Sequence, residues 1–126
     1  ANLCSDAGAA IDRKGEHYIA IELSDVSGSV RTAPTAAGTY TIYPDTGSEP
    51  AKSASFTITA LDQTCQAIDA DSGAGQSGSV TLTSAAGGVF AGSFDVVLNT
   101  GDHVTGTFAP SACPQLATAT DQRTCG

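Results

Sequence analysis

A stretch of alternating apolar and polar residues, 77–110, constrains the fold more than any other part of the chain. It reads SGSVTLTSAAGGVFAGSFDVVLNTGDHVTGTFAP. Three runs within it alternate with a period of two, which is typical of strands with one buried and one solvent-facing side. The apolar anchors of these runs fall on even numbers: Val80, Leu82, Phe90, Phe94, Val96, Leu98, Val104 and Phe108. We therefore expect three consecutive antiparallel strands that pair even positions with even positions.

The same parity selects the loop between the second and third strands. A three-residue loop at 99–101, closed by Leu98 and Asp102, keeps even positions paired and puts Gly101 at the left-handed position that such loops need. The predicted partners are Val96 with Val104, Phe94 with Gly106, and Gly92 with Phe108.

A loop at 85–87 extends this reasoning to the first hairpin. The predicted partners there are Leu82 with Phe90, Val80 with Gly92, and Gly78 with Phe94. Each large ring would then cover a glycine on the neighbouring strand. Phe94 would lie over Gly78 and Gly106, and we expect it to be the central residue of the core.

The rest of the chain predicts further strands separated by turn signals. The expected strands are 17–24, 29–31, 38–43, 53–61 and 64–69, and 69–78 is expected to be a mobile turn. Residues 1–15 are expected to be irregular, and 111–126 to be a loop held by its cysteines. This pattern indicates a single all-β domain over 1–126, an antiparallel β-sandwich or flattened barrel of about seven or eight strands.

Charge and composition exclude several classes of function. The 126 residues carry a formal net charge of −8 with only five lysines and arginines, so no basic stripe is available for nucleic acid. No apolar run reaches the length of a membrane span. Neither nucleic acid nor a membrane span is therefore expected.

The four cysteines, Cys4, Cys65, Cys113 and Cys125, favour two disulfides over a zinc site because no two of them are closely spaced. We expect Cys113–Cys125 with Cys4–Cys65, and the alternative is Cys65–Cys113 with Cys4–Cys125. An even number of cysteines and a low content of charged residues favour an extracellular or cell-surface location.

Several motifs resemble those of small secreted or lipoprotein-type β-domains of myxobacteria and related Gram-negative bacteria. They are GTYTI, the strand SGSVTLT, GSFDV and the closing GTFAPSAC, together with the mid-chain cysteine, within residues 37–125. These motifs consist of turn glycines, core aromatics and cysteines, so the resemblance implies a fold and carries over no catalytic residue. Such domains are similar to this one but have more sheet-forming sequence upstream, which implies a missing strand here.

The sequence offers few residues for catalysis or metal binding. His103 lies beside Asp102, with Asp95, Ser93 and Ser79 predicted nearby, but no G-x-S-x-G motif holds a nucleophile. We therefore expect no enzyme activity and no cofactor. Asp69 and Asp71 echo the start of a calcium loop whose closing glutamate is absent, and a solvated acidic turn is the favoured interpretation.

A polar face on the outward side of the predicted sheet is the remaining candidate for binding. It contains Thr81, Thr83, Thr105 and Thr107, and Tyr18 and Tyr43 are the aromatics with outward parity. We expect a non-catalytic structural module of the bacterial cell surface, such as a matrix or fibre subunit that self-associates through its N-terminal region and an open sheet edge. The alternative is a secreted module that binds glycan or another ligand.

Overall fold

The computed structural model describes residues 11–12, 14–113 and 124–125, and these are mostly strand. The elements in chain order are β1 (Ile11–Asp12), β2 (His17–Ser27), β3 (Val30–Thr32), β4 (Gly38–Ile42), β5 (Lys52–Ala60), η1 (Asp69–Asp71), β6 (Gly73–Ser84), η2 (Ala86–Gly88), β7 (Ala91–Leu98), β8 (His103–Phe108) and β9 (Thr124–Cys125). The two η elements are short 3-10 helices. Among the described residues, no helix is long and apolar enough to cross a membrane.

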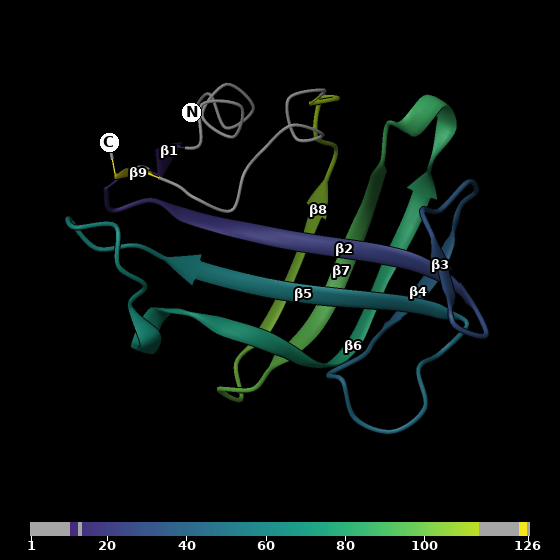
Figure 1. The fold of residues 1–126 in the computed structure, drawn as a ribbon, viewed down its shortest axis with the longest axis horizontal. Coiled ribbons are helices and arrows are strands. Elements are labelled where there is room, and N and C mark those ends of the chain that lie inside the picture. Colours follow the sequence, from purple (N-terminus) through teal and green to yellow (C-terminus); the bar gives the residue numbers. More distant parts are fainter. Residues whose placement is uncertain (1–10, 13, 114–123, 126) are drawn as a thin grey trace. The chain divides into compact units, whose positions relative to one another are not determined.

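Seven of the strands form one mixed sheet in the order β3-β2-β5-β4-β6-β7-β8 (Figure 1). Strands β4 and β5 run parallel, with Thr41 opposite Ser53, whereas β6, β7 and β8 are antiparallel neighbours. The all-β prediction is confirmed, but the purely antiparallel arrangement is wrong, and the described residues do not show the two facing sheets of a sandwich. The reason lies in the wide proline-containing loop after β4, which returns the chain so that β5 runs beside β4 in the same direction.

The chain divides into two compact units, which we describe separately. The sheet unit comprises Ile19–Ile58 and Gly73–Ser111, and the disulfide unit comprises the described parts of residues 1–18, 59–72 and 112–126. That the whole chain folds as one domain stays a prediction.

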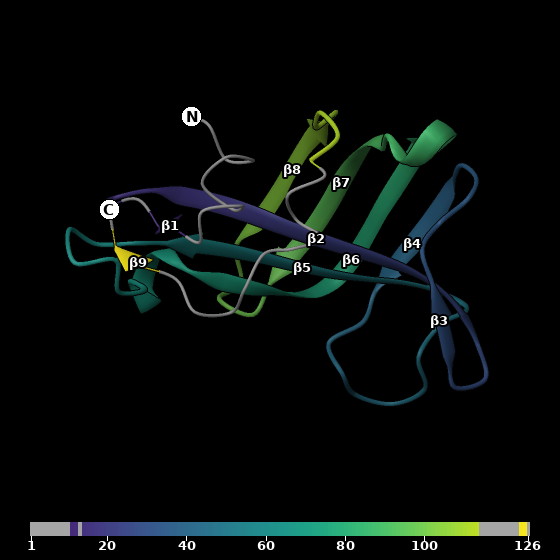
Figure 2. The ribbon, with the colours of Figure 1, turned by 45° about the horizontal axis from the view of Figure 1, so that its top comes forward.

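In the sheet unit, β2 and β5 cross over β6, β7 and β8, as Figures 1 and 2 show from two directions. Side chains between these layers form the core, and the largest fully buried ones are Tyr40, Phe56, Leu82, Val80 and Val96. The ring of Phe56 on β5 lies 5.0 Å from the ring of Phe94 on β7, measured between centroids. Phe56 is 1% exposed and Phe94 is only half-buried, so the prediction that Phe94 is the central core residue is wrong.

The predicted hairpin between β7 and β8 is confirmed in detail. Phe94 pairs with Gly106 and Val96 with Val104. The loop closes with a hydrogen bond of 2.8 Å from the Leu98 amide to the Asp102 carbonyl, and Gly101 has a φ of 93°. A side chain on Gly106 would collide with the Phe94 ring, because an added Cβ would lie 2.6 Å from it. The ring of Phe94 therefore covers Gly106, as predicted.

The register of the preceding hairpin is wrong by two residues. Val80 pairs with Phe94 and Leu82 with Gly92, and a bulge lies between Leu82 and Ser84. The connection is longer than the predicted loop because η2 and the residues after it, including Phe90, lie outside both strands. Between Gly78 and Leu82, even positions nevertheless still face even positions.

Two further local predictions are wrong for identifiable reasons. The supposed mobile turn 69–78 contains η1 and the first residues of β6, because β6 extends back to pair with β5 at Thr57 and Ile58. The supposed strand 64–69 is a turn, since the Asp62 carboxylate accepts hydrogen bonds from the amides of Thr64 and Gln66 and Cys65 has a φ of 58°.

The disulfide unit is joined by Cys65–Cys125, with a Cα–Cα distance of 5.6 Å. Both predicted cysteine pairings are therefore wrong in the partner of Cys65. The reason is that Thr124–Cys125 returns as β9 to pair with β1, which the sequence of this short segment does not indicate. Cys113 is not a free thiol either. Cys4 and most of the segments predicted as irregular or loop, 1–10 and 114–123, lie outside the described residues.

Candidate functional site

The outward face of β6, β7 and β8 carries the predicted polar surface, here called the Ser/Thr face. Ser79 lies opposite Asp95 on β7, and Asp95 lies opposite Thr105 on β8; Thr81, Ser93 and Thr107 form a second such row. These side chains surround a shallow hollow of about 410 Å³, whose lining also includes parts of Phe94 and Gly106. The structure thus brings Thr81, Thr105 and Thr107 together as the sequence indicated.

Three other residues of the predicted binding face do not line this hollow. Thr83 lies beyond it at the bulge of β6, where its hydroxyl donates to the Ala91 carbonyl at 3.0 Å. Tyr43 follows β4 and donates its hydroxyl to the Gly47 carbonyl at 3.2 Å. Tyr18 is a half-buried residue of β2 in the disulfide unit.

His103 and Asp95 contact one another at one end of the Ser/Thr face. The Nε2 of His103 lies 2.6 Å from an Oδ1 of Asp95, and both side chains are largely exposed, at 59% and 69%. The imidazole Nε2 contacts the Asp95 carboxylate, and Ser79 and Ser93 lie in the two rows of the Ser/Thr face beside it. The pair is a surface contact of a kind that contributes little to stability.

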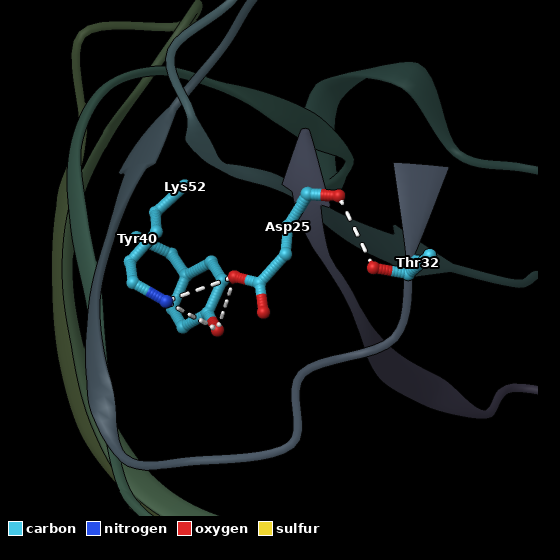
Figure 3. A network of polar contacts seen from close by, with 4 residues as sticks. All are labelled: Asp25, Thr32, Tyr40 and Lys52. Carbon is cyan, nitrogen blue, oxygen red and sulfur yellow. Dashed lines mark hydrogen bonds and ion pairs between the residues drawn. The ribbon is translucent and has the colours of Figure 1, made fainter. Parts of the chain in front are cut away.

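A second polar cluster lies at the edge of the core, among β2, β4 and β5 (Figure 3). The Tyr40 hydroxyl and the Lys52 ammonium both donate to Oδ1 of Asp25 at 2.9 Å. Lys52 also lies 4.8 Å from the centre of the Tyr40 ring. The Thr32 hydroxyl lies next to the cluster and donates to the backbone carbonyl of Asp25 at 3.5 Å.

The electrostatics of this cluster indicate a structural role. The hydrogen bond from Lys52, followed by that from Tyr40, lowers the pKa of Asp25 below the usual aspartate range. The hydrogen bond to Asp25 raises the pKa of Lys52, and burial raises the pKa of Tyr40. A lysine that acts as a nucleophile or base needs the opposite shift. Lys52 therefore stays charged and joins three strands.

This cluster could not be predicted from the sequence, because its members come from three separate strands. The one available signal was the inward parity of Tyr40, since a buried tyrosine usually finds a partner for its hydroxyl. Nothing in the sequence shows that Asp25 and Lys52 supply it.

The described part of the chain contains no assembled metal-binding site. Asp69 and Asp71 lie in η1, where both are exposed. No group of three or more histidine, cysteine, aspartate or glutamate side chains gathers there or elsewhere among the described residues. The acidic turn that the sequence favours is thus compatible with the placement of these two residues.

Comparisons of the chain with protein-family models, with curated proteins and with solved structures find no match. The resemblance to secreted β-domains of myxobacteria stays a prediction.

Proposed function

We propose that this protein is a non-catalytic structural module of a bacterial cell surface or extracellular matrix, which associates with further copies of itself. The observation that carries the proposal is the open sheet, whose last strand, β8, has a neighbour on one side only in the described part of the chain. Unpaired strand edges are sites of strand addition.

Two further observations support this proposal. Two polar clusters of the sheet unit are of structural types, namely the Asp25–Tyr40–Lys52 cluster and an ion pair of 2.8 Å between Arg31 and Glu49. The Cys65–Cys125 disulfide is of a kind that persists in oxidising surroundings outside the cytosol. A stable surface module needs contacts that join its strands and a cross-link that persists outside the cell, and it needs no reactive side chain.

Sedimentation of the purified chain over a wide concentration range tests self-association, with negative-stain microscopy of the most concentrated sample. We expect the weight-average mass to rise above 12.5 kDa with concentration. The measurement should be made at about 0.15 M salt, because a net charge of −8 per copy repels other copies unless it is screened. A mass that stays at 12.5 kDa throughout would contradict the proposal.

A second candidate function, binding of a glycan or another polar ligand, is favoured by the hollow on the Ser/Thr face. Hydroxyls and one carboxylate line it, and these groups can exchange hydrogen bonds with a sugar. A glycan array tests this function. Binding that is lost in Asp95→Ala and retained in Thr83→Ala, which alters a hydroxyl outside the hollow, would favour it over the structural proposal.

A further inference from the structure

The two ends of the seven-stranded sheet differ in how they are protected. Strand β3 is three residues long, and its middle residue, Arg31, is charged and paired with Glu49. Short length and charge are the usual protections of an edge strand. Strand β8 is six residues long, has no lysine, arginine, carboxylate or proline, and has only His103 as a titratable side chain. Strand β8 therefore lacks the protections that β3 has.

The hydrogen-bond pattern shows which groups of β8 are available. Because the Leu98 amide bonds to the Asp102 carbonyl, the pair Leu98–Asp102 is a hydrogen-bonded one. Hydrogen-bonded and non-bonded pairs alternate along an antiparallel ladder, so the even residues of β8 point their amides and carbonyls at β7. The amides and carbonyls of His103, Thr105 and Thr107 therefore point to the open edge.

The side chains of β8 have a pattern that matches its own reverse. The segment 104–108 reads Val-Thr-Gly-Thr-Phe, which is apolar, threonine, glycine, threonine, apolar about Gly106. The apolar pair, Val104 and Phe108, is half-buried, whereas Thr105 and Thr107 are exposed on the opposite face. An antiparallel copy of this strand would meet like with like, and a self-complementary patch is what a two-fold interface requires.

We infer that β8 pairs antiparallel with β8 of a second copy, with Gly106 of each chain at the two-fold axis. Thr105 then exchanges hydrogen bonds with Thr107 of the other copy, and Val104 lies beside the other copy's Phe108 on the core side. Asp102 meets Pro110, so no like charges are opposed at the ends of the pair. This inference rests on the proposed function and specifies the surface through which the copies associate.

Disulfide trapping tests the register directly. Two single variants, Thr105→Cys and Thr107→Cys, are mixed under mild oxidation, and the cross-links are mapped by mass spectrometry without reduction. Directly opposed residues of a hydrogen-bonded pair have Cα atoms about 5.5 Å apart, which suits a disulfide. Residues diagonally opposed are about 7–8 Å apart.

We expect the mixture to form a cross-link between position 105 and position 107, and each variant alone to form little. A dominant 105-to-105 cross-link would place Thr105 at the axis and overturn the Gly106 register. Absence of any cross-link at concentrations where the wild-type chain associates would overturn the β8 interface while leaving the proposed function standing.

Proline at position 107 provides the second test. Thr107→Pro removes an amide that points to the open edge and leaves the bonds to β7 in place, and its preceding residue is glycine. Each dimer loses two hydrogen bonds, so we expect the dissociation constant to rise by about tenfold or more. The control, Thr107→Ser, keeps the amide and should associate like the wild type. Equal association of the two variants, both folded by circular dichroism, would overturn the inference.

Discussion

Asp25, Tyr40 and Lys52 show how a single buried hydroxyl is accommodated at the edge of a core. Tyr40 is fully buried, and an unpaired hydroxyl there would weaken the fold. One oxygen of Asp25 accepts hydrogen bonds from both Tyr40 and Lys52. The ammonium also lies against the face of the tyrosine ring, a favourable cation–π position. The polar groups of these three side chains thus have their partners within the cluster.

The lowered pKa of Asp25 leads to a prediction about pH. A carboxylate with a lowered folded-state pKa stabilises the protein above the ordinary aspartate pKa of about 4, and this contribution is lost as pH falls through the folded-state pKa. We expect the difference in unfolding free energy between wild type and Asp25→Asn, measured with urea, to shrink as pH falls below about 4. In a Lys52→Met background, the same substitution should show a weaker pH dependence. A difference that is constant with pH would contradict this role.

Gly106 leads to a prediction about close approach. An added Cβ would meet the Phe94 ring, and that ring is backed by Phe56, so it has little room to move. We expect Gly106→Ala to lower the free energy of unfolding by about 1–3 kcal/mol, as overpacking does. Thr105→Ala, an exposed neighbour on the same strand, is the matched control and should change it by about 0.5 kcal/mol or less. Equal effects of the two variants in urea unfolding would show that the ring can yield.

At the scale of elements, β5 is a strand with several neighbours in the sheet unit. It lies between β2 and β4 in the sheet order and also pairs with β6 at Thr57 and Ile58. Its inward residues Ala54 and Phe56 are each 1% exposed. The strand therefore connects the two layers that cross in Figure 2, and its central side chain fills the space between them.

This position of β5 predicts an order of sensitivity among the aromatic residues. Phe56→Ala should lower the free energy of unfolding by about 3–5 kcal/mol, as for other fully buried aromatics. Phe94→Ala should cost less, because the Phe94 ring is only half-buried. Thermal or urea unfolding of the two variants measures both values. A larger loss for Phe94→Ala would contradict this order and indicate that Phe94 on β7 is the central residue of the core.

At the scale of the whole molecule, one disulfide joins distant parts of the chain. Cys65 and Cys125 are separated by 60 residues, and both belong to the disulfide unit. A cross-link over a loop of this length stabilises by about 2–4 kcal/mol, mainly by restricting the unfolded chain. The turn that presents Cys65 is fixed by the Asp62 carboxylate, to which the Thr64 hydroxyl donates at 2.7 Å.

The cysteine pairing gives the fourth prediction. Because Cys65 bonds to Cys125, a second disulfide can join only Cys4 and Cys113. We expect peptide mapping without reduction to recover both cross-linked peptides, and the double variant Cys65→Ser/Cys125→Ser to unfold at lower urea concentration. A peptide that joins Cys113 to Cys125 would contradict this pairing. Four free thiols would also contradict the extracellular location.

The Ser/Thr face and the Asp25–Tyr40–Lys52 cluster differ in whether the sequence could reveal them. The Ser/Thr face was predictable because outward parity is a local property: Thr81, Thr105 and Thr107 project to one side of any strand that buries Leu82 and Phe108. The Asp25–Tyr40–Lys52 cluster was not predictable, because it depends on which strands lie side by side.

By itself, the sequence determined the buried and outward faces of β6, β7 and β8, and the register of β7 and β8, because alternation and turn chemistry act over a few residues. Only the tertiary structure decided the parallel pairing of β4 and β5, the extension of β6 that pairs with β5, and the partner of Cys65. These depend on contacts between segments far apart in the chain, whose free energies come from packing across the crossed layers. Parity restricts such contacts, but it does not select among them.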